Sequence, residues 1–274
     1  MAQIRAIKVN HLNTVLEDFE GSLDHFVQAY GGEYFLEVQT PDARAGLCEV
    51  GNVIFEVFSP KMWLLNARYG PHYLGLEFQV ESLAEGRLAL DEHGIRVARE
   101  LGIALHSNPA DLHGTSIELY EDEFHERDYE LLGGRKLRGQ AFWRDEHPLG
   151  LTGIAAVTWP VHDAALVAGK LGTLFGATQA YAEDRPALGA RAIGVPVADT
   201  VMELLQPTGP GVIADHLRDH GEGLRSTVLG ARDMAAVRSW CADRALPLEA
   251  GSAADRLAVP AAANHGVMIE FAPG

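Results

Sequence analysis

The sequence predicts an α+β fold in which four β-α-β-β-β modules pair into two cup-shaped domains with mixed sheets. The first observation is a short apolar strand with a single glutamate, which recurs at Glu56, Glu118, Glu203 and Glu270. Because side chains alternate along a strand, each glutamate faces away from its apolar neighbours. The second observation is spacing: Glu56 and Glu203 are 147 residues apart, and Glu118 and Glu270 are 152 apart. Repetition of this kind indicates a duplicated unit.

The first module spans residues 4–60. A strand is expected over 4–13, where apolar and polar residues alternate, and an amphipathic helix over 18–32, which Gly31 and Gly32 end. The remaining strands are expected over 33–38, 43–50 and 52–59, with turns at Pro41-Asp42 and Gly51-Asn52.

The second module spans residues 72–121. It has a strand over 73–80, a helix over 82–94, and a last strand that holds Glu118. Residues 122–150 are charged and show no clean period, so we interpret them as a linker whose charges are solvated. This places the first domain at 1–121 and the second at 151–274.

The third and fourth modules span residues 151–207 and 222–274. Each opens with a strand followed by a helix of matching period, as in the first domain. The expected strands are 151–161, 179–182, 190–197, 200–205, 223–231 and the one ending at Ile269-Glu270, and the expected helices are 164–176, 212–218 and 234–244.

Composition restricts the function. The formal charge of -16 argues against nucleic acid, which requires a basic surface. The sequence has neither a run of about 18 apolar residues nor an N-terminal signal pattern, so we expect no membrane segment and a cytoplasmic protein. The two cysteines, Cys48 and Cys241, lie in apolar surroundings, and we expect reduced thiols.

Two stretches resemble a known family. Residues 202–233 (MELLQPTGPGVIADHLRDHGEGLRSTVLGARD) join a glutamate strand, a Pro-Thr-Gly loop, a short helix and the start of a new module. In the opening strand, His11 is followed seven residues later by Asp18. Both resemble the vicinal oxygen chelate superfamily of glyoxalases, bleomycin-resistance proteins and extradiol dioxygenases, and the resemblance covers nearly the whole chain except the linker. It implies the fold more strongly than the function, because this fold supports many chemistries.

The resemblance implies a divalent metal in the first domain, held by up to four side chains. Three positions carry suitable ligands: His11, Glu56 and Glu118. At the fourth, Gly75 aligns where the family has histidine, so we assign His72, which a β-bulge would turn inward. Tyr73 and Glu77 are its rivals for this place. Imidazole and carboxylate ligands suit Fe, Mn, Zn, Ni or Co.

The second domain departs from the family pattern. Its corresponding positions are Ala156, Glu203, Ser226 and Glu270, so both histidines are absent. Two carboxylates alone make a poor site for a transition metal. We therefore expect this domain not to hold the catalytic metal but to be structural, or to supply a wall or a partner interface.

Three functions fit these expectations. The first is a metal-dependent isomerase, epimerase or lyase that stabilises an enolate of a small oxygenated substrate, with Glu56 or Glu118 as the base. The second is ring cleavage with Fe(II) and O2 at His11, His72 and Glu118. The third is a metal-free protein that sequesters a small ligand. The edge strands leave room for a homodimer.

Overall fold

The structure is a computed structural model that describes residues 2–39, 43–59 and 70–274. The turn expected at Pro41-Asp42 lies outside these residues. The first half contains, in chain order, β1 (Ala6–Val15), α1 (Phe19–Tyr30), β2 (Glu33–Gln39), β3 (Arg44–Val50), β4 (Val53–Phe58), β5 (His72–Val80), α2 (Leu83–Glu92), β6 (Val97–Glu100), β7 (Ala104–Ser107), the short η1 (Pro109–Asp111) and β8 (Ser116–Tyr120).

The connection and the second half follow. They contain η2 (Glu130–Leu132), α3 (Gly139–Ala141), η3 (Phe142–Glu146), β9 (Leu151–Pro160), α4 (Ala164–Phe175), β10 (Tyr181–Arg185), η4 (Pro186–Leu188), β11 (Ala190–Val197), β12 (Thr200–Pro207), α5 (Val212–His220), β13 (Ser226–Ala231), α6 (Met234–Asp243), β14 (Glu249–Ala250), β15 (Leu257–Val259), η5 (Ala261–Ala263) and β16 (Met268–Pro273). The strand expected over 179–182 forms slightly later, as β10.

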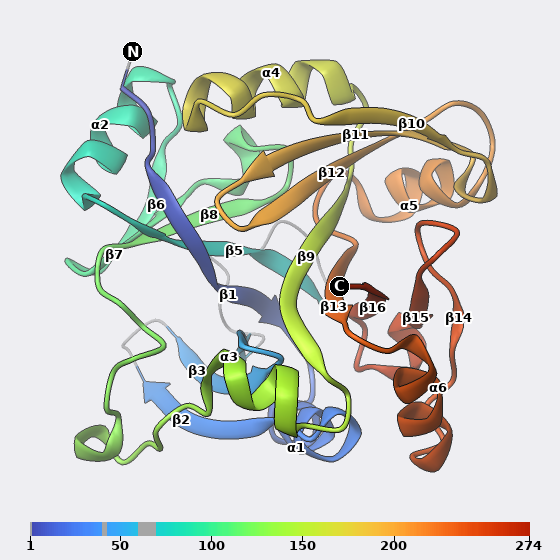
Figure 1. The fold of residues 1–274 in the computed structure, drawn as a ribbon. Coiled ribbons are helices and arrows are strands. Elements are labelled where there is room, and N and C mark those ends of the chain that lie inside the picture. Colours follow the sequence, from blue (N-terminus) through green and yellow to red (C-terminus); the bar gives the residue numbers. More distant parts are fainter. Residues whose placement is uncertain (1, 40–42, 60–69) are drawn as a thin grey trace.

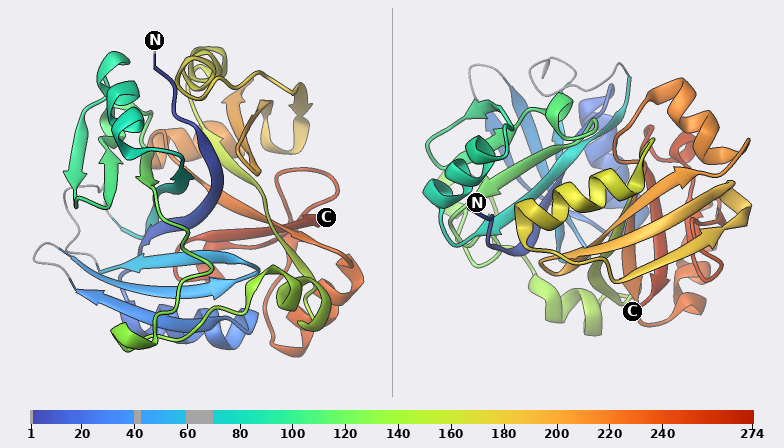
Figure 2. Two further views of the ribbon diagram at one scale, coloured as in Figure 1. Left: turned by 60° about the vertical axis from the view of Figure 1, so that its left-hand side comes forward. Right: turned by 90° about the horizontal axis from the view of Figure 1, so that it is seen from above.

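The described strands form two eight-stranded sheets with the same topology. Their orders are β2-β3-β4-β1-β5-β8-β7-β6 and β10-β11-β12-β9-β13-β16-β15-β14. Both sheets are mixed, since β1 runs parallel to β4 and antiparallel to β5. The predicted α+β fold with two cup-shaped halves is therefore confirmed. Figures 1 and 2 show the blue-to-green first half beside the yellow-to-red second half.

Strand alternation gives the first sheet two different faces. On β4, Val53, Phe55 and Val57 belong to the large core that both halves share. Ile54 and Phe58, which alternate with these residues, belong to a second apolar cluster on the other face, inside the cup. Glu56 lies between these two, so it points into the cup.

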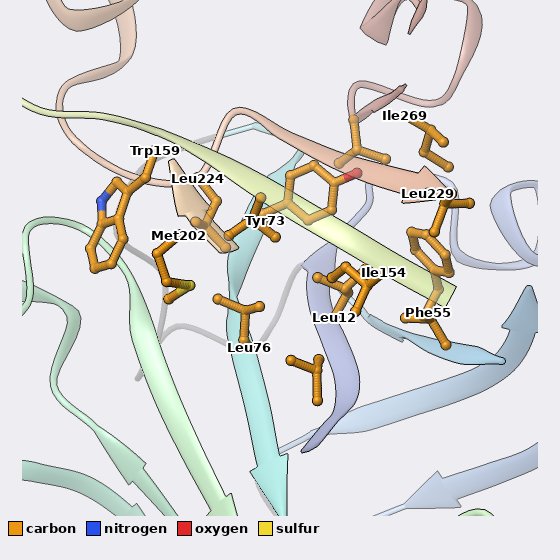
Figure 3. Close-up of a cluster of buried hydrophobic side chains, with 14 of the residues drawn as sticks. Leu12, Phe55, Tyr73, Leu76, Ile154, Trp159, Met202, Leu224, Leu229 and Ile269 are labelled. Carbon is orange, nitrogen blue, oxygen red and sulfur yellow. The ribbon is translucent and has the colours of Figure 1, made fainter. Parts of the chain in front are cut away.

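The two sheets pack against each other through an apolar core. Figure 3 shows side chains from β1, β4 and β5 meeting side chains from β9, β12, β13 and β16. Hydrogen bonds cross the same boundary: the Tyr73 hydroxyl donates to the Met268 carbonyl at 2.8 Å, and the Val9 amide donates to Asp199 Oδ1 at 2.7 Å. The halves thus share one hydrophobic core.

The segment 122–150 is more than a charged connection. Its charged residues are largely solvated, but Phe124, Tyr129 and Trp143 are buried. The backbone N–H of Arg138 donates to Glu49 Oε2 on β3 at 2.9 Å. The segment therefore packs on the first sheet as well as connecting the two halves. No helix in the described ranges is long and apolar enough to cross a membrane.

Candidate functional site in the first sheet

A row of polar side chains crosses five adjacent strands inside the first cup. In backbone register, Glu56 on β4 pairs with Asn13 on β1, and His11 pairs with Glu77 on β5. Glu77 pairs in turn with Glu118 on β8, and Glu118 pairs with His106 on β7. Neighbouring paired residues lie about 5 Å apart, so the row places ionisable groups in direct contact.

The row opens onto a cavity of about 240 Å³. His11, Glu56, Glu77 and Glu118 all line it, and so do aromatic and aliphatic side chains from the cup and from the segment 122–150. This combination of a few convergent polar groups with apolar walls is typical of a small-molecule site.

His11 lies between two carboxylates. Its Nδ1 is 3.1 Å from Glu77 Oε2 and 3.7 Å from Glu56 Oε2, and its ring meets Phe124 edge-on at 4.2 Å. Burial by itself lowers the pKa of His11, but the charges of Glu77 and Glu56 outweigh burial and raise this pKa well above its ordinary value. His11 therefore carries a proton at neutral pH when no cation replaces it.

Glu118 is held from two sides. Asn13 Nδ2 donates to its Oε2 at 2.6 Å, and His106 Nε2 lies 3.0 Å from its Oε1. Burial favours the neutral acid, but His106, His11 and the Asn13 bond together keep the pKa of Glu118 below its usual range. Arg99 adds positive charge behind His106, with NH1 at 3.2 Å from Nε2. Glu118 is thus a fixed anion.

Glu77 is the least compensated carboxylate of the row. Burial raises its pKa, and the negative charges of Glu118 and Glu56 act in the same direction against His11. Its Oε1 is buried without a hydrogen bond among the described residues. With Glu118 paired to His106, Glu56 and Glu77 share the single imidazole of His11, and the remaining negative charge is costly unless a cation or a proton neutralises it.

The structure does not bring His72 to the cavity, although we assigned it as a ligand. His72 opens β5, and its Nδ1 lies 2.7 Å from the Gly70 carbonyl. No side chain fits at the aligned position, because a Cβ on Gly75 would lie 1.7 Å from the Ser116 carbonyl oxygen. Glu77, two residues further along the strand, lines the cavity instead.

A strand irregularity decides between the other two candidates. The register shifts between the pairs Asn13–Gly75 and Thr14–Tyr73, which inverts the alternation along β5. Tyr73 therefore points into the core between the sheets, where Figure 3 shows it, and Glu77 points into the cup. Simple alternation would have put both on one face.

The residues present suit a divalent cation, although none of the described His, Cys, Asp and Glu side chains already forms a cage of three or more ligands. Within the described part of the chain, Nε2 of His11 and Oε1 of Glu77 are buried without hydrogen bonds. Buried polar atoms are normally satisfied, so unsatisfied atoms in a cavity indicate a missing partner. An imidazole with carboxylates is a donor set for Mn, Fe, Co, Ni or Zn.

The matching row of the second sheet has lost these groups. The same registers place Ala156 where the first sheet has His11, Val228 where it has Glu77, and Ala258 where it has His106. Ala156 and Val228 pack with Ala272 in a small apolar cluster. Apolar packing therefore replaces the imidazoles and the third carboxylate.

The two glutamates that remain in the second sheet are neutralised by neighbours. Glu203 accepts hydrogen bonds from Arg256 NH1 at 2.5 Å, Arg185 NH2 at 3.2 Å and the Tyr181 hydroxyl. Glu270 accepts from the Ser226 hydroxyl at 2.5 Å and the Ser252 amide at 2.7 Å. Both are fully buried, so these carboxylates act as structural anchors in closed networks.

Comparison with solved structures gives the same fold over almost the whole chain. A mutant of 4-hydroxymandelate synthase from Streptomyces coelicolor superimposes with a TM-score of 0.75 at 15% identity, covering 97% of this chain and 92% of that one. The two proteins share their fold. Methylmalonyl-CoA epimerase from Streptomyces coelicolor (20% identity) covers 44% of this chain and 96% of its own, with a TM-score of 0.41.

A protein of unassigned function, BH1468 from Bacillus halodurans C-125, covers 44% of this chain and 93% of its own at 16% identity, with a TM-score of 0.41. No protein-family model and no curated protein matches the sequence. The likeness to 4-hydroxymandelate synthase extends through both sheets, and at this identity it concerns the fold.

Sequence reasoning did not find every residue of the site. His106 was not among the predicted ligands, but it lies on β7 directly opposite Glu118. Phe124 and Tyr129 line the cavity from a segment that we had interpreted as a linker. The signal for His106 was its position twelve residues before Glu118, which is the span of an antiparallel hairpin with a long loop.

Proposed function

We propose that this protein is a metal-dependent enzyme of the vicinal oxygen chelate type that acts on a small oxygenated organic substrate. The observation that carries the proposal is the row of ionisable groups that meets in one enclosed cavity of the first sheet. The second sheet, which has the same topology, has apolar residues at three of these positions. The likeness in fold to 4-hydroxymandelate synthase supports an enzyme on this scaffold.

The metal would be held by His11, Glu77 and Glu118. These residues occupy three adjacent strands and are paired in register, so their side chains converge on one place. When bound, a divalent ion polarises a carbonyl oxygen and favours loss of a proton from the neighbouring carbon. Glu77 replaces His72 in the ligand set that the sequence suggested.

Glu56 is our candidate for the base. Its side chain is 13% exposed, compared with 3% for Glu77 and 6% for Glu118, so it is the most accessible carboxylate in the cavity. A base needs a free oxygen within hydrogen-bond reach of the proton that it removes. Glu118 is assigned to the metal instead, because Asn13 and His106 hold its oxygens in place.

The remaining groups would position the ligands. Asn13 and His106 fix both oxygens of Glu118, and Arg99 lies behind His106. Such outer contacts orient metal ligands and tune their charge. Removal of a proton by Glu56 and its return to a neighbouring carbon would produce an isomerase. An epimerase would need a second group that returns the proton on the opposite face, and loss of a leaving group from the same intermediate would produce a lyase.

The alternative of Fe(II)-dependent ring cleavage is less well supported. In the sequence-based prediction, ring cleavage required His11, His72 and Glu118 to lie together as iron ligands. His72 does not line the cavity, so that triad is not assembled. Proton transfer depends only on residues that the cavity contains.

Metal analysis tests the proposal. Protein should be purified without chelator or a His-tag and incubated with Fe, Mn, Zn, Ni or Co. We expect close to one ion per chain in the wild type, and loss of this ion in both His11→Ala and Glu118→Ala. His162→Ala is the control, because His162 is exposed and lies outside this cavity. Absence of metal from the wild type under all five conditions would overturn the enzyme proposal and favour a metal-free ligand-binding protein.

A further inference from the structure

The cavity changes in character between its charged row and its mouth. His11, Glu77 and Glu118 are at most 4% exposed. Leu101, Ile103 and Leu132 line the same cavity but are 41%, 56% and 62% exposed. The carboxylates and His11 therefore lie at the inner end, and three large aliphatic side chains, together with the exposed Arg127, line the opening.

The walls between these two ends are apolar. Phe58, Phe124, Tyr129 and Leu47 line the cavity and are buried. The volume of about 240 Å³ exceeds the roughly 150 Å³ of a dry apolar cavity that holds benzene. The space is sufficient for a ring or a branched chain together with a short polar group.

Two arginines line the cavity, and each contacts a neighbouring side chain in its wall. Arg127 NH1 donates to the Tyr120 hydroxyl at 3.1 Å, and Arg99 NH1 lies 3.2 Å from His106 Nε2. Among the described residues, no lysine lines the cavity. A phosphate or a nucleotide is normally recognised by several convergent basic groups or by a helix N-terminus. The walls fit an apolar ligand body better than a phosphorylated one.

The mouth of the cavity is lined by aliphatic side chains from two parts of the chain. Leu101 and Ile103 come from the turn between β6 and β7, whereas Leu132 comes from η2 in the segment 122–150. Two parts of the chain that are distant in sequence thus place large apolar groups around one opening. Exposed apolar surface that borders a pocket is typical of a binding site for apolar groups.

We propose that the substrate is amphipathic. Its oxygenated head reaches the row at His11 and Glu77, and its apolar body, a ring or an alkyl chain, extends past Phe124 and Tyr129 to the leucine and isoleucine side chains of the mouth. This inference rests on the proposed function for the role of the head. The apolar body is inferred from the walls and the mouth alone.

Binding of straight-chain 2-oxo acids with three, six and eight carbons tests this inference. All three carry the same pair of neighbouring oxygens, so only the apolar tail changes. We expect isothermal titration calorimetry of Mn²⁺-loaded protein to show affinity rising about three- to four-fold for each methylene that the cavity buries.

The chain offers a matched pair of variants. Leu132→Asp should weaken binding of the eight-carbon acid at least tenfold and leave the three-carbon acid unchanged. Leu131→Asp should leave all three affinities unchanged, because Leu131 is the adjacent residue, is 96% exposed and does not line the cavity.

Several results would overturn the inference. Equal affinities for the three acids, or undetectable binding of the eight-carbon acid, would exclude an apolar ligand body. Equal effects of Leu131→Asp and Leu132→Asp on affinity would show that the two leucines act through the outer surface of the protein and not through the cavity. Failure of the metal proposal would give a different result. In that case, His11→Ala without metal would bind the acids like the wild type, and the affinity would still depend on tail length in both proteins.

Discussion

At the scale of single residues, buried charge determines what the first cup can hold. His11 is protonated and Glu77 has a raised pKa because three carboxylates share one buried face. A divalent ion would take over the neutralising role of these protons and release them. The energetic cost of the site without a cation would thus favour the proposed binding of a metal ion.

The first prediction concerns Glu77. Glu77→Gln keeps the size of the side chain but removes one charged ligand, so Mn²⁺ binding should weaken by more than about 100-fold. The fold should persist, because the change relieves carboxylate repulsion. Calorimetric titration of the variant with Mn²⁺ measures the effect, with the exposed Glu81→Gln as the control. Unchanged affinity in Glu77→Gln would exclude Glu77 as a ligand.

The second prediction concerns Gly75. A Cβ at this position would lie 1.7 Å from the Ser116 carbonyl oxygen, so Gly75→Ala should force β5 and β8 apart. We expect the free energy of unfolding to fall by roughly 2–4 kcal/mol. Urea denaturation measures this change.

Gly169→Ala is the matched control for Gly75→Ala. Gly169 lies on α4 with open space around its position, so alanine there should stabilise the protein by up to about 1 kcal/mol. Equal effects of the two substitutions would contradict the close approach of the strands.

At the scale of elements, periodicity predicts the modules but not the segment between them. The β-α-β-β-β units have regular apolar spacing and could be predicted from it. Residues 122–150 contain only short helical turns, so the buried Phe124, Tyr129 and Trp143 follow no period. Their contribution to the core and to the cavity follows from tertiary packing, which the sequence pattern does not reveal.

The third prediction concerns His147, which ends η3. Burial, with a smaller contribution from Arg244, lowers the pKa of His147 to about 4, and its Nδ1 accepts the Leu149 amide at 3.3 Å. Between about pH 6.5 and 4 the unfolded chain binds a proton that the folded chain does not. The free energy of unfolding should therefore fall with decreasing pH, by up to about 1.4 kcal/mol per unit from this group.

Urea denaturation at pH 7, 6 and 5 tests the role of His147. His147→Phe should be less sensitive to acid than the wild type, whereas the exposed His162→Phe should behave like the wild type. An identical pH slope in the wild type and His147→Phe would refute this role.

At the scale of the whole molecule, the two halves depend on each other. The core between the sheets combines β1, β4 and β5 with β9, β12, β13 and β16 (Figure 3). Asn264 in the second half accepts hydrogen bonds from Tyr30 at 2.7 Å and lies 2.8 Å from His25 Nε2, both in the first half. The duplicated sequence indicates two similar units, but it does not reveal this shared core.

The fourth prediction follows from this dependence. Asn264→Ala should lower the free energy of unfolding by about 1–3 kcal/mol, because the buried Tyr30 hydroxyl loses its partner. Unfolding should remain one cooperative transition, seen at the same urea concentration by tryptophan fluorescence and by circular dichroism. Two separate transitions, with only the second half destabilised, would show that the halves fold independently.

The same scale explains which part of the site could be predicted. Glu56 and Glu118 were predicted from the repeated glutamate strand, and His11 was predicted from the resemblance of the opening strand to the family. The choice of Glu77 over Tyr73 depends on the register shift near Gly75. The position of His106 beside Glu118 depends on the pairing of β7 with β8. Strand register depends on contacts across the sheet and is not determined by local sequence.

Anomalous diffraction from crystals soaked in Mn²⁺ tests the central claim most directly, since it locates the ion in the molecule. The proposed site predicts one strong peak per chain, within coordination distance of His11, Glu77 and Glu118, and no peak beside Glu203 or Glu270. A peak in the second cup, or a fully soaked crystal with no peak at His11, would contradict the assignment of the first sheet as the metal-binding half.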